Sequence, residues 1–258
     1  EYQVKMGDEW VKKDMSERVV ENLALLEIDA LVLIGGDGTL TIGSKLKNLG
    51  LKLVGVPKTI DNDLSATDIT FGFNTAVTTA TEAIDKLHTT AESHHRIMIL
   101  EVMGRDAGWI AVEAGIAGGA DVILIPEIPF DLNVVAETID DRKRRGSKFS
   151  IVVVAEGAFP EGGELRYIEQ TIGSRTLKTL GGIGDFVADK LSEMLSMESR
   201  TTVLGHLQRG GSPTTYDRLL ATRFGMKAVD LLAEGKYGHM VTLKGSNIDS
   251  APIEDGIV

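Results

Sequence analysis

A chain of 258 residues with 43% hydrophobic and 25% charged residues has the composition of an ordinary globular protein of one or two compact domains. Its net charge of -11 argues against partners such as nucleic acid or an anionic membrane, which need a basic face, and no apolar run is long enough to span a membrane. The absence of cysteine excludes disulfides, thiolate catalysis and cysteine-held zinc, and the cytoplasm is the expected compartment.

Short apolar runs alternate along the chain with longer amphipathic stretches. The runs have the length of buried strands and cover residues 31–34, 51–56, 97–102, 122–124, 151–155 and 202–204. Helical spacing of apolar residues is found in residues 15–26, 76–89, 134–145, 186–197 and 217–233. This alternation predicts an α/β fold with a largely parallel sheet covered by helices.

Five polar or glycine-rich segments directly follow expected strands. GGDG follows Ile34, PKTIDND follows Val56, MGRDAG follows Val102, a Glu-Gly pair follows Ala155 and GHLQRGG follows Leu204. Ligands of α/β sheets bind at the carboxyl ends of strands. We therefore expect these segments to surround one cleft between two lobes.

The segment GGDGT, residues 35–39, is typical of a phosphate-binding turn. Paired glycines before a helix let backbone amides approach an anion closely, and Asp37 could hold a magnesium ion that bridges phosphate oxygens. A tight strand-to-helix turn with Asp37 as the helix cap is the alternative interpretation. The motif recurs in several classes of phosphoryl-transfer enzyme.

The segment PKTIDND, residues 57–63, places two carboxylates, a hydroxyl and an ammonium group at one strand end. Phosphoryl transfer to an alcohol needs a carboxylate that accepts the hydroxyl proton and a metal that neutralises developing charge. Asp61 and Asp63 have the character of a base and its partner. An Asx-rich turn without catalytic function would use the same residues.

Cationic side chains also gather near expected strand ends. These are Arg96, Arg105, Arg200, His206 and Arg209. Because guanidinium groups match phosphate bidentately, their concentration in an acidic chain suits a substrate of the size of a bisphosphate. The dense charge run DDRKRR, residues 140–145, is interpreted as a solvated helix end, with a second anion site as the alternative.

Together these segments resemble the 6-phosphofructokinase family over essentially the whole chain. GGDGT, PKTIDND, SHHRI, MGRDAG, AEG and GHLQRGGSPTTYDR stand in the family's order and approximate spacing. The resemblance implies two Rossmann-like three-layer lobes with largely parallel sheets and an active site at the strand carboxyl ends in the cleft. It implies a donor lobe of residues 1–72 with 213–236, lacking its front part, and a fructose 6-phosphate lobe of residues 73–212 with 237–258.

The resemblance also implies an activity, namely transfer of the ATP γ-phosphoryl group to the 1-hydroxyl of fructose 6-phosphate in glycolysis, with Mg²⁺ as cofactor. By motif, Asp61 is the general base, Thr59 positions the transferred group, and Asp63 and Arg105 complete the catalytic set. The donor-binding residues are Gly36, Asp37, Gly38, Thr39 and Lys58, with Asp37 serving the metal. The sugar phosphate is held by Thr59, Ile60, Asp61, Arg96, Met103, Gly104, Arg105, Glu156, Arg200, His206 and Arg209.

Within this set, His206 and Arg209 are expected to bind the 6-phosphate together with Arg96 and Arg200. Many family members take the latter two arginines from a neighbouring subunit. The resemblance therefore implies a homodimer or homotetramer with shared active sites, and no nucleic-acid or membrane partner.

Two departures from the family pattern leave the phosphoryl donor open. Lys58 replaces the glycine of many bacterial ATP enzymes and resembles members that use pyrophosphate, whereas Gly38 resembles the ATP users. Pyrophosphate-dependent phosphotransfer to fructose 6-phosphate is therefore the alternative activity. The family's usual first strand and Gly-Gly-Asp loop are not found before GGDGT, so a truncated, non-catalytic paralogue that binds sugar phosphate is a further alternative. An NAD kinase or lipid kinase would share GGDGT but would not explain MGRDAG or GHLQRGG.

Overall fold

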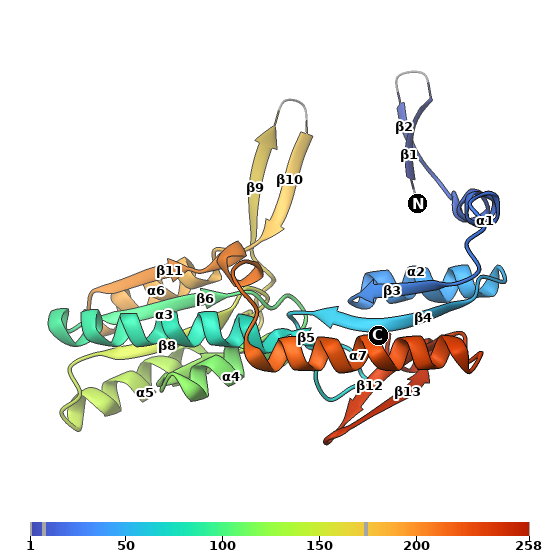
Figure 1. Ribbon diagram of the computed structural model, residues 1–258. Helices are drawn as coiled ribbons and strands as arrows, with labels where there is room; N and C mark the ends of the chain where they lie inside the picture. The colour runs from blue at the N-terminus through green and yellow to red at the C-terminus, as the bar shows by residue number, and fades with distance from the viewer. Residues whose placement is uncertain (1, 7–8, 173–174, 258) are drawn as a thin grey trace. The chain divides into compact units, whose positions relative to one another are not determined.

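The computed structural model describes residues 2–6, 9–172 and 175–257. The chain forms two compact units that alternate along the sequence. Unit 1 consists of Glu1–Thr59, Asp63–Phe71 and Arg218–Val258, and unit 2 of Ile60–Asn62 and Gly72–Asp217. Each unit has a largely parallel sheet with helices on both faces (Figure 1), which confirms the predicted α/β class.

The main sheet of unit 1 has the order β13-β12-β4-β3, in which only β13 runs antiparallel to its neighbour. Its strands are β3 (Leu31–Gly35), β4 (Leu53–Thr59), β12 (His239–Lys244) and β13 (Asn247–Pro252), and the short β5 (Phe71–Gly72) also pairs with β4. The helical elements are α1 (Ser16–Leu25), α2 (Asp37–Asn48), α7 (Thr215–Ala233), which starts in unit 2, and the 3-10 turn η2 (Ile253–Asp255). An antiparallel hairpin of β1 (Tyr2–Met6) and β2 (Glu9–Lys13) precedes them.

Strand β4 is buried on both faces because alternate side chains point to opposite sides of the sheet. Val54 and Val56 pack with Phe224 of α7, whereas Leu53 packs with Leu40 of α2 on the other face. These two clusters are the cores of unit 1, and they hold the carboxyl ends of β3 and β4 at one edge.

The sheet of unit 2 has the order β11-β6-β8-β7, and all of its pairs are parallel. Its strands are β6 (Ile97–Val102), β7 (Val122–Leu124), β8 (Ser150–Ala155) and β11 (Ser199–Val203). Every residue of β6 and β8 is buried, as expected for the two central strands of a helix-covered parallel sheet.

Four helices cover the sheet of unit 2. Helices α5 (Leu132–Arg144) and α6 (Ile183–Leu195) pack on one face, and α3 (Phe73–His94) and α4 (Trp109–Ala117) pack against each other and on β8. The 3-10 helix η1 (Gly205–Arg209) follows β11. The antiparallel pair β9 (Tyr167–Ile172) and β10 (Arg175–Leu180) extends from the unit as a ribbon (Figure 1) and pairs with no other strand in the described ranges. No helix in these ranges has both the length and the apolar character needed to cross a membrane.

The division of the chain differs from the predicted one at its C-terminal side. Residues 237–258 were expected to join residues 73–212, but β12 pairs with β4 at His239 opposite Val54, which places them in unit 1. The chain returns from unit 2 to unit 1 after Asp217, within α7, whereas the predicted boundary lay before residue 213. Residues 60–62 of the PKTIDND segment belong to unit 2.

Candidate active site

The GGDG segment of unit 1 forms the junction between β3 and α2. Gly36 occupies the N-cap position of α2, so this position provides no side-chain hydrogen bond to the helix. Asp37 is the first helical residue, so it is not the cap that the alternative interpretation required. The positive end of the helix dipole therefore lies at this junction, where it favours an anion, and Gly38 and Thr39 are exposed there.

Thr59, at the end of β4, lies against this junction. A Cβ atom on Gly36 would come within 3.0 Å of the Thr59 Cβ atom, so the close approach depends on glycine. At Gly38, by contrast, a Cβ atom would meet nothing within 4 Å. The neighbouring Lys58 side chain is exposed. Unit 1 thus brings Gly36, Asp37, Thr39 and Thr59 to one strand edge.

The turn after Thr59 has a specific backbone shape. The Thr70 hydroxyl donates to the Thr59 carbonyl oxygen at 2.8 Å, and Asn62 adopts a left-handed conformation with φ of 53°. Asparagine tolerates this conformation better than most residues. The Asx-rich turn is therefore real, and it leaves Asp61 half-buried and assigned to unit 2, while Asp63 belongs to unit 1.

In unit 2, hydrogen bonds join three strand ends. The Glu156 amide donates to the Val102 carbonyl at 2.9 Å, and the Met103 amide donates to Oε1 of Gln208 at 2.7 Å. Nε of Arg209 lies 3.3 Å from the Met103 sulfur. The segments after β6, β8 and β11 consequently form one cluster, as the sequence predicted for these three.

Glu156 is the electrostatic centre of this cluster. Burial raises the pKa of the Glu156 carboxyl, and the negative charges of Glu101 and Asp61 raise it further. A hydrogen bond from the Gly104 backbone and the positive charge of Arg209 oppose the shift without cancelling it. The Glu156 carboxyl therefore lies within reach of the charges of both Asp61 and Arg209.

Glycine is required where these segments meet. Gly104 has a φ of 139°, and a Cβ atom on Gly157 would stand 1.8 Å from the Arg105 carbonyl oxygen. The backbone is thus held tightly, but the Arg105 side chain is 70% exposed, with Asp106 at 3.6 Å beside it. Its guanidinium group can turn toward a ligand.

Arg96 and Arg200 lie at the amino ends of β6 and β11, whereas Met103 and Arg209 follow the carboxyl ends of the same strands. Nε of Arg96 pairs with Oε2 of Glu198 at 2.7 Å, and Arg200 pairs with the other oxygen of the same carboxylate. The Arg96 hydrogen bond lowers the pKa of Glu198. Seven residues separate Arg96 from Met103, a distance of roughly 20 Å along a strand. Within the chain, these two arginines are not brought together with His206 and Arg209.

Two buried polar residues of the cluster were not among the predicted site residues. Gln208 is 1% exposed, and the Glu101 carboxylate is 3% exposed and accepts hydrogen bonds from the Gly182 and Gly184 amides. Burial raises the pKa of Glu101. A single acidic residue inside the apolar run of β6 was the signal that could have identified Glu101.

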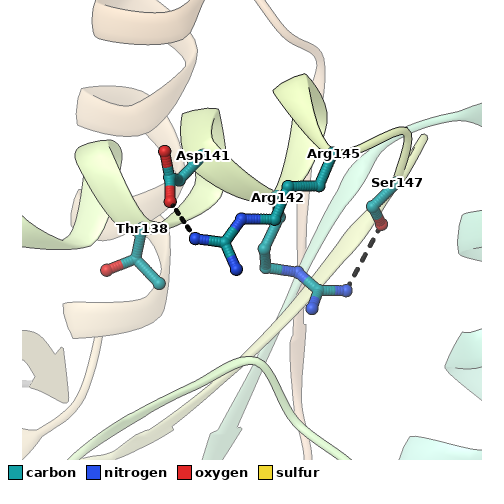
Figure 2. A pocket seen from close by; sticks show the side chains of 5 residues that line it. All are labelled: Thr138, Asp141, Arg142, Arg145 and Ser147. Atoms are coloured by element: carbon teal, nitrogen blue, oxygen red, sulfur yellow. Dashed lines mark hydrogen bonds and ion pairs between the residues drawn. The ribbon is translucent and has the colours of Figure 1, made fainter.

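The charge run at residues 140–145 forms the solvated end of α5. Figure 2 shows Arg145 paired with Asp141 and Arg142 hydrogen-bonded to Ser147, around a cavity of about 360 Å³. Arg142 also pairs with Asp121 at 2.8 Å. These cations have carboxylate partners, which favours the solvated-helix interpretation.

Asp37 is the residue expected to serve a metal. In the part of the chain that the structure describes, no three histidine or carboxylate residues gather as a metal site. A magnesium ion delivered with a polyphosphate needs only one or two protein carboxylates, because phosphate oxygens and water complete its coordination. The position of Asp37 at the α2 N-terminus fits that arrangement.

Comparison with known proteins bears out the resemblance. A family model described as phosphofructokinase matches residues 4–232. The chain is 55% identical over 248 residues to an ATP-dependent 6-phosphofructokinase 2 of Clostridium perfringens, and the match covers 96% of this chain and 68% of the relative. It is 54% identical over 233 residues to a pyrophosphate--fructose 6-phosphate 1-phosphotransferase of Amycolatopsis mediterranei, covering 90% of this chain and 68% of that one.

Solved structures give the same result. Pichia pastoris phosphofructokinase in the T-state matches with a TM-score of 0.81 and 33% identity, over 93% of this chain and 28% of the yeast chain. A pyrophosphate-dependent phosphofructokinase from Marinobacter aquaeolei matches with a TM-score of 0.78 and 27% identity, over 92% of this chain and 62% of the other. The chain therefore belongs to the phosphofructokinase family.

Proposed function

We propose that this protein acts as an ATP-dependent 6-phosphofructokinase, which converts fructose 6-phosphate and ATP to fructose 1,6-bisphosphate and ADP. The observation that carries the proposal is the cluster of Asp61, Glu156 and Arg209 at the strand carboxyl ends of unit 2. It supplies a carboxylate for proton transfer, a second polar group for the sugar and a cation for a phosphate. As a glycolytic enzyme, the protein is proposed to work in the cytoplasm.

The donor is proposed to bind at the N-terminus of α2. Its amides and dipole suit the ATP phosphates, with Gly36, Gly38 and Thr39 lining the approach and Asp37 holding a magnesium ion. Bound there with ATP, magnesium would neutralise charge that develops on the phosphate oxygens. Thr59 and Asp63, which flank the Asp61 turn, are proposed to position the transferred group and its surroundings.

The acceptor is proposed to bind at the unit 2 cluster. Asp61 accepts the proton of the sugar 1-hydroxyl as that oxygen forms a bond to the γ-phosphorus, and the bond from that phosphorus to the leaving ADP oxygen breaks. Glu156, Ile60 and the segment Met103–Arg105 hold the sugar, and Arg105 also reaches the transferred group. His206 and Arg209 bind the 6-phosphate.

Arg96 and Arg200 are proposed to complete the 6-phosphate site of a neighbouring copy. Their place at the amino ends of β6 and β11 keeps them away from their own chain's Met103 and Arg209. A homodimer or homotetramer with shared active sites accounts for that separation.

The choice of donor depends on two neighbouring positions. Gly38 leaves open space in which an ATP α-phosphate meets neither a side chain nor a repelling carboxylate. Lys58 favours the second candidate, pyrophosphate-dependent transfer, because its exposed ammonium group adds charge beside the donor. An absent obstruction at Gly38 discriminates more sharply than one flexible cation, so ATP is the proposed donor.

The test is a coupled assay of fructose 1,6-bisphosphate formation, run separately with Mg-ATP and Mg-pyrophosphate. We expect faster turnover with ATP, and Gly38→Asp should reverse or abolish that preference. The new Cβ atom would meet no protein atom within 4 Å, so the substitution should not disturb the fold. Gly225→Asp, at a glycine of α7 with equally open surroundings, should leave the donor preference unchanged. Pyrophosphate activity with negligible ATP activity would instead support pyrophosphate-dependent transfer and overturn the assignment of donor choice to Gly38. Inactivity with both donors, together with retained sugar-phosphate binding, would identify a non-catalytic paralogue.

A further inference from the structure

Gln208 has an environment unlike that of its neighbours in η1. His206, Leu207 and Arg209 are exposed, whereas Gln208 is 1% exposed and is the one buried residue of this element. A five-residue 3-10 helix has few and poorly aligned hydrogen bonds of its own. Contacts outside η1, among them those of the Gln208 side chain, therefore hold it in place.

That side chain reaches the first residue after β6. Its Oε1 atom accepts the Met103 amide hydrogen at 2.7 Å, a shorter contact than the 3.3 Å between Nε of Arg209 and the Met103 sulfur. Met103 lies beside Gly104 and Arg105, which are proposed to hold the sugar. His206 and Arg209, on either side of Gln208, are proposed to hold the 6-phosphate. Together with the contact of Arg209 with the Met103 sulfur, this hydrogen bond connects the residues at the two ends of the proposed acceptor.

Stability alone does not account for this residue. The other end of the Gln208 amide, Nε2, is buried and has no hydrogen-bond partner among the described residues. A buried amide that leaves a donor unsatisfied is destabilising relative to an apolar side chain of similar size. The residue is therefore explained by what its oxygen positions.

We infer that Gln208 is a positioning residue that sets the spacing between the 6-phosphate-binding residues and the sugar-binding residues of the acceptor site. This inference rests on the proposed function. Gln208 does not need to contact the substrate, since it acts through Met103 on one side and through His206 and Arg209 on the other. Its loss should weaken binding of fructose 6-phosphate and leave binding of the phosphoryl donor unchanged.

The main variant is Gln208→Met, which keeps the length of the side chain and removes the acceptor. By calorimetry, we expect the dissociation constant of fructose 6-phosphate to rise about tenfold, the upper end for the loss of one neutral hydrogen bond. The KM for the donor should stay unchanged. Gln208→Glu retains an acceptor for the Met103 amide, so at the same pH its fructose 6-phosphate affinity should fall by clearly less than about tenfold. That measurement serves if Gln208→Met does not fold, and a loss of about tenfold or more in Gln208→Glu would count against the inference.

A double-mutant cycle separates positioning from a general structural effect. Arg209→Ala and Gln208→Met act on the same interaction, so the double variant should bind fructose 6-phosphate about as weakly as Arg209→Ala alone. Independent effects would instead multiply, to about a hundredfold loss. Thr201→Val is the matched control, because it removes another buried, unpartnered polar atom from the strand that leads to η1. Its affinity should equal that of the unmutated protein.

Unchanged fructose 6-phosphate affinity in Gln208→Met, or multiplicative losses in the cycle, would overturn the inference while the proposed function stands. An unmutated protein that neither binds nor converts fructose 6-phosphate would remove the proposed function and this inference together.

Discussion

Asp61 carries the chemical step of the proposed reaction, so its replacement should separate catalysis from binding. Asp61→Asn keeps the shape of the side chain and removes its basicity, and we expect kcat to fall by about 10²–10⁴. The fructose 6-phosphate affinity should change by only a few-fold. Steady-state kinetics and calorimetry measure the two quantities. Asp189→Asn, at an exposed aspartate of α6, is the control, and near-normal kcat in Asp61→Asn would refute the assignment.

Glu101 should influence the acid side of the pH profile through Glu156. Its negative charge disfavours a second negative charge nearby and so contributes to the raised pKa of Glu156. In Glu101→Gln that contribution disappears, the Glu156 pKa falls, and the carboxylate form persists to lower pH. The loss of fructose 6-phosphate affinity on acidification should therefore begin at lower pH than in the unmutated protein.

The control for this titration is Glu113→Gln. Burial also raises the pKa of Glu113, but its carboxyl does not act on Glu156. Its affinity profile should coincide with that of the unmutated protein. A Glu101→Gln profile shifted to higher pH would contradict the electrostatic role of Glu101.

Among individual residues, the sequence identified those whose chemistry is evident from the residue type and the surrounding motif. Asp61, Glu156 and Arg209 were predicted to act together, and the structure brings their charges together. Gln208 and Glu101 were not predicted, because their importance comes from a backbone amide of another segment. A glutamine between a leucine and an arginine carries no sign of the partner that it will have after folding.

Among the elements, α3 depends on a cap from a distant residue. Its N-cap residue, Gly72, has no side chain, and the Asp217 carboxylate of α7 accepts the Thr75 amide at 2.8 Å as well as the Thr75 hydroxyl. Loss of such a cap costs about 1–2 kcal/mol. Asp217→Ala should therefore lower the denaturant midpoint measured by circular dichroism.

The comparison variant is Asp230→Ala, which removes an exposed aspartate from the same helix. Its midpoint should stay close to that of the unmutated protein. Equal midpoints for the two variants would show that Asp217 does not stabilise α3.

Elements with a strong apolar pattern were the ones that the sequence could locate. The runs at residues 97–102 and 122–124 coincide with β6 and β7, since buried parallel strands leave little room for polar residues. The expected strand at 202–204 is β11, which instead begins at Ser199 because its first residues are polar. The hairpins β1–β2, β9–β10 and β12–β13 were not predicted, because their strands mix polar and apolar residues in sequence.

For the whole molecule, the separation of Arg200 from Arg209 leads to a test of shared sites. Asp61→Asn and Arg200→Ala should each have low activity when purified alone. If Arg200 serves a neighbouring copy, mixed oligomers contain sites with both residues intact, about a quarter of all sites for random dimers. Activity should therefore return when the two variants are mixed and allowed to exchange subunits. A mixture that remains as inactive as its components would show that Arg200 serves its own chain.

Two-lobe α/β architecture followed from the sequence, but the division of the chain did not. Residues 237–258 join unit 1 through pairing of β12 with β4, a contact between distant segments that no local pattern indicates. The same limit applies to the arginines. The sequence placed Arg96 at a strand start, but only the pairing of β11 with β6 shows that Arg200 lies beside it at the same end of the sheet.

The nested order of the units also has a consequence during synthesis. Unit 2 is formed almost entirely by one uninterrupted stretch, Gly72–Asp217, whereas β4 must wait for β12, roughly 185 residues later. At ribosomal rates of about 5–20 residues per second, that interval is on the order of 10–40 s. During it the part of β4 around Val54 and Gly55 lacks the partner strand that it has in the folded protein, and the apolar residues of β4 lack the cover of α7. The nascent chain is thus expected to be most prone to aggregation at β4.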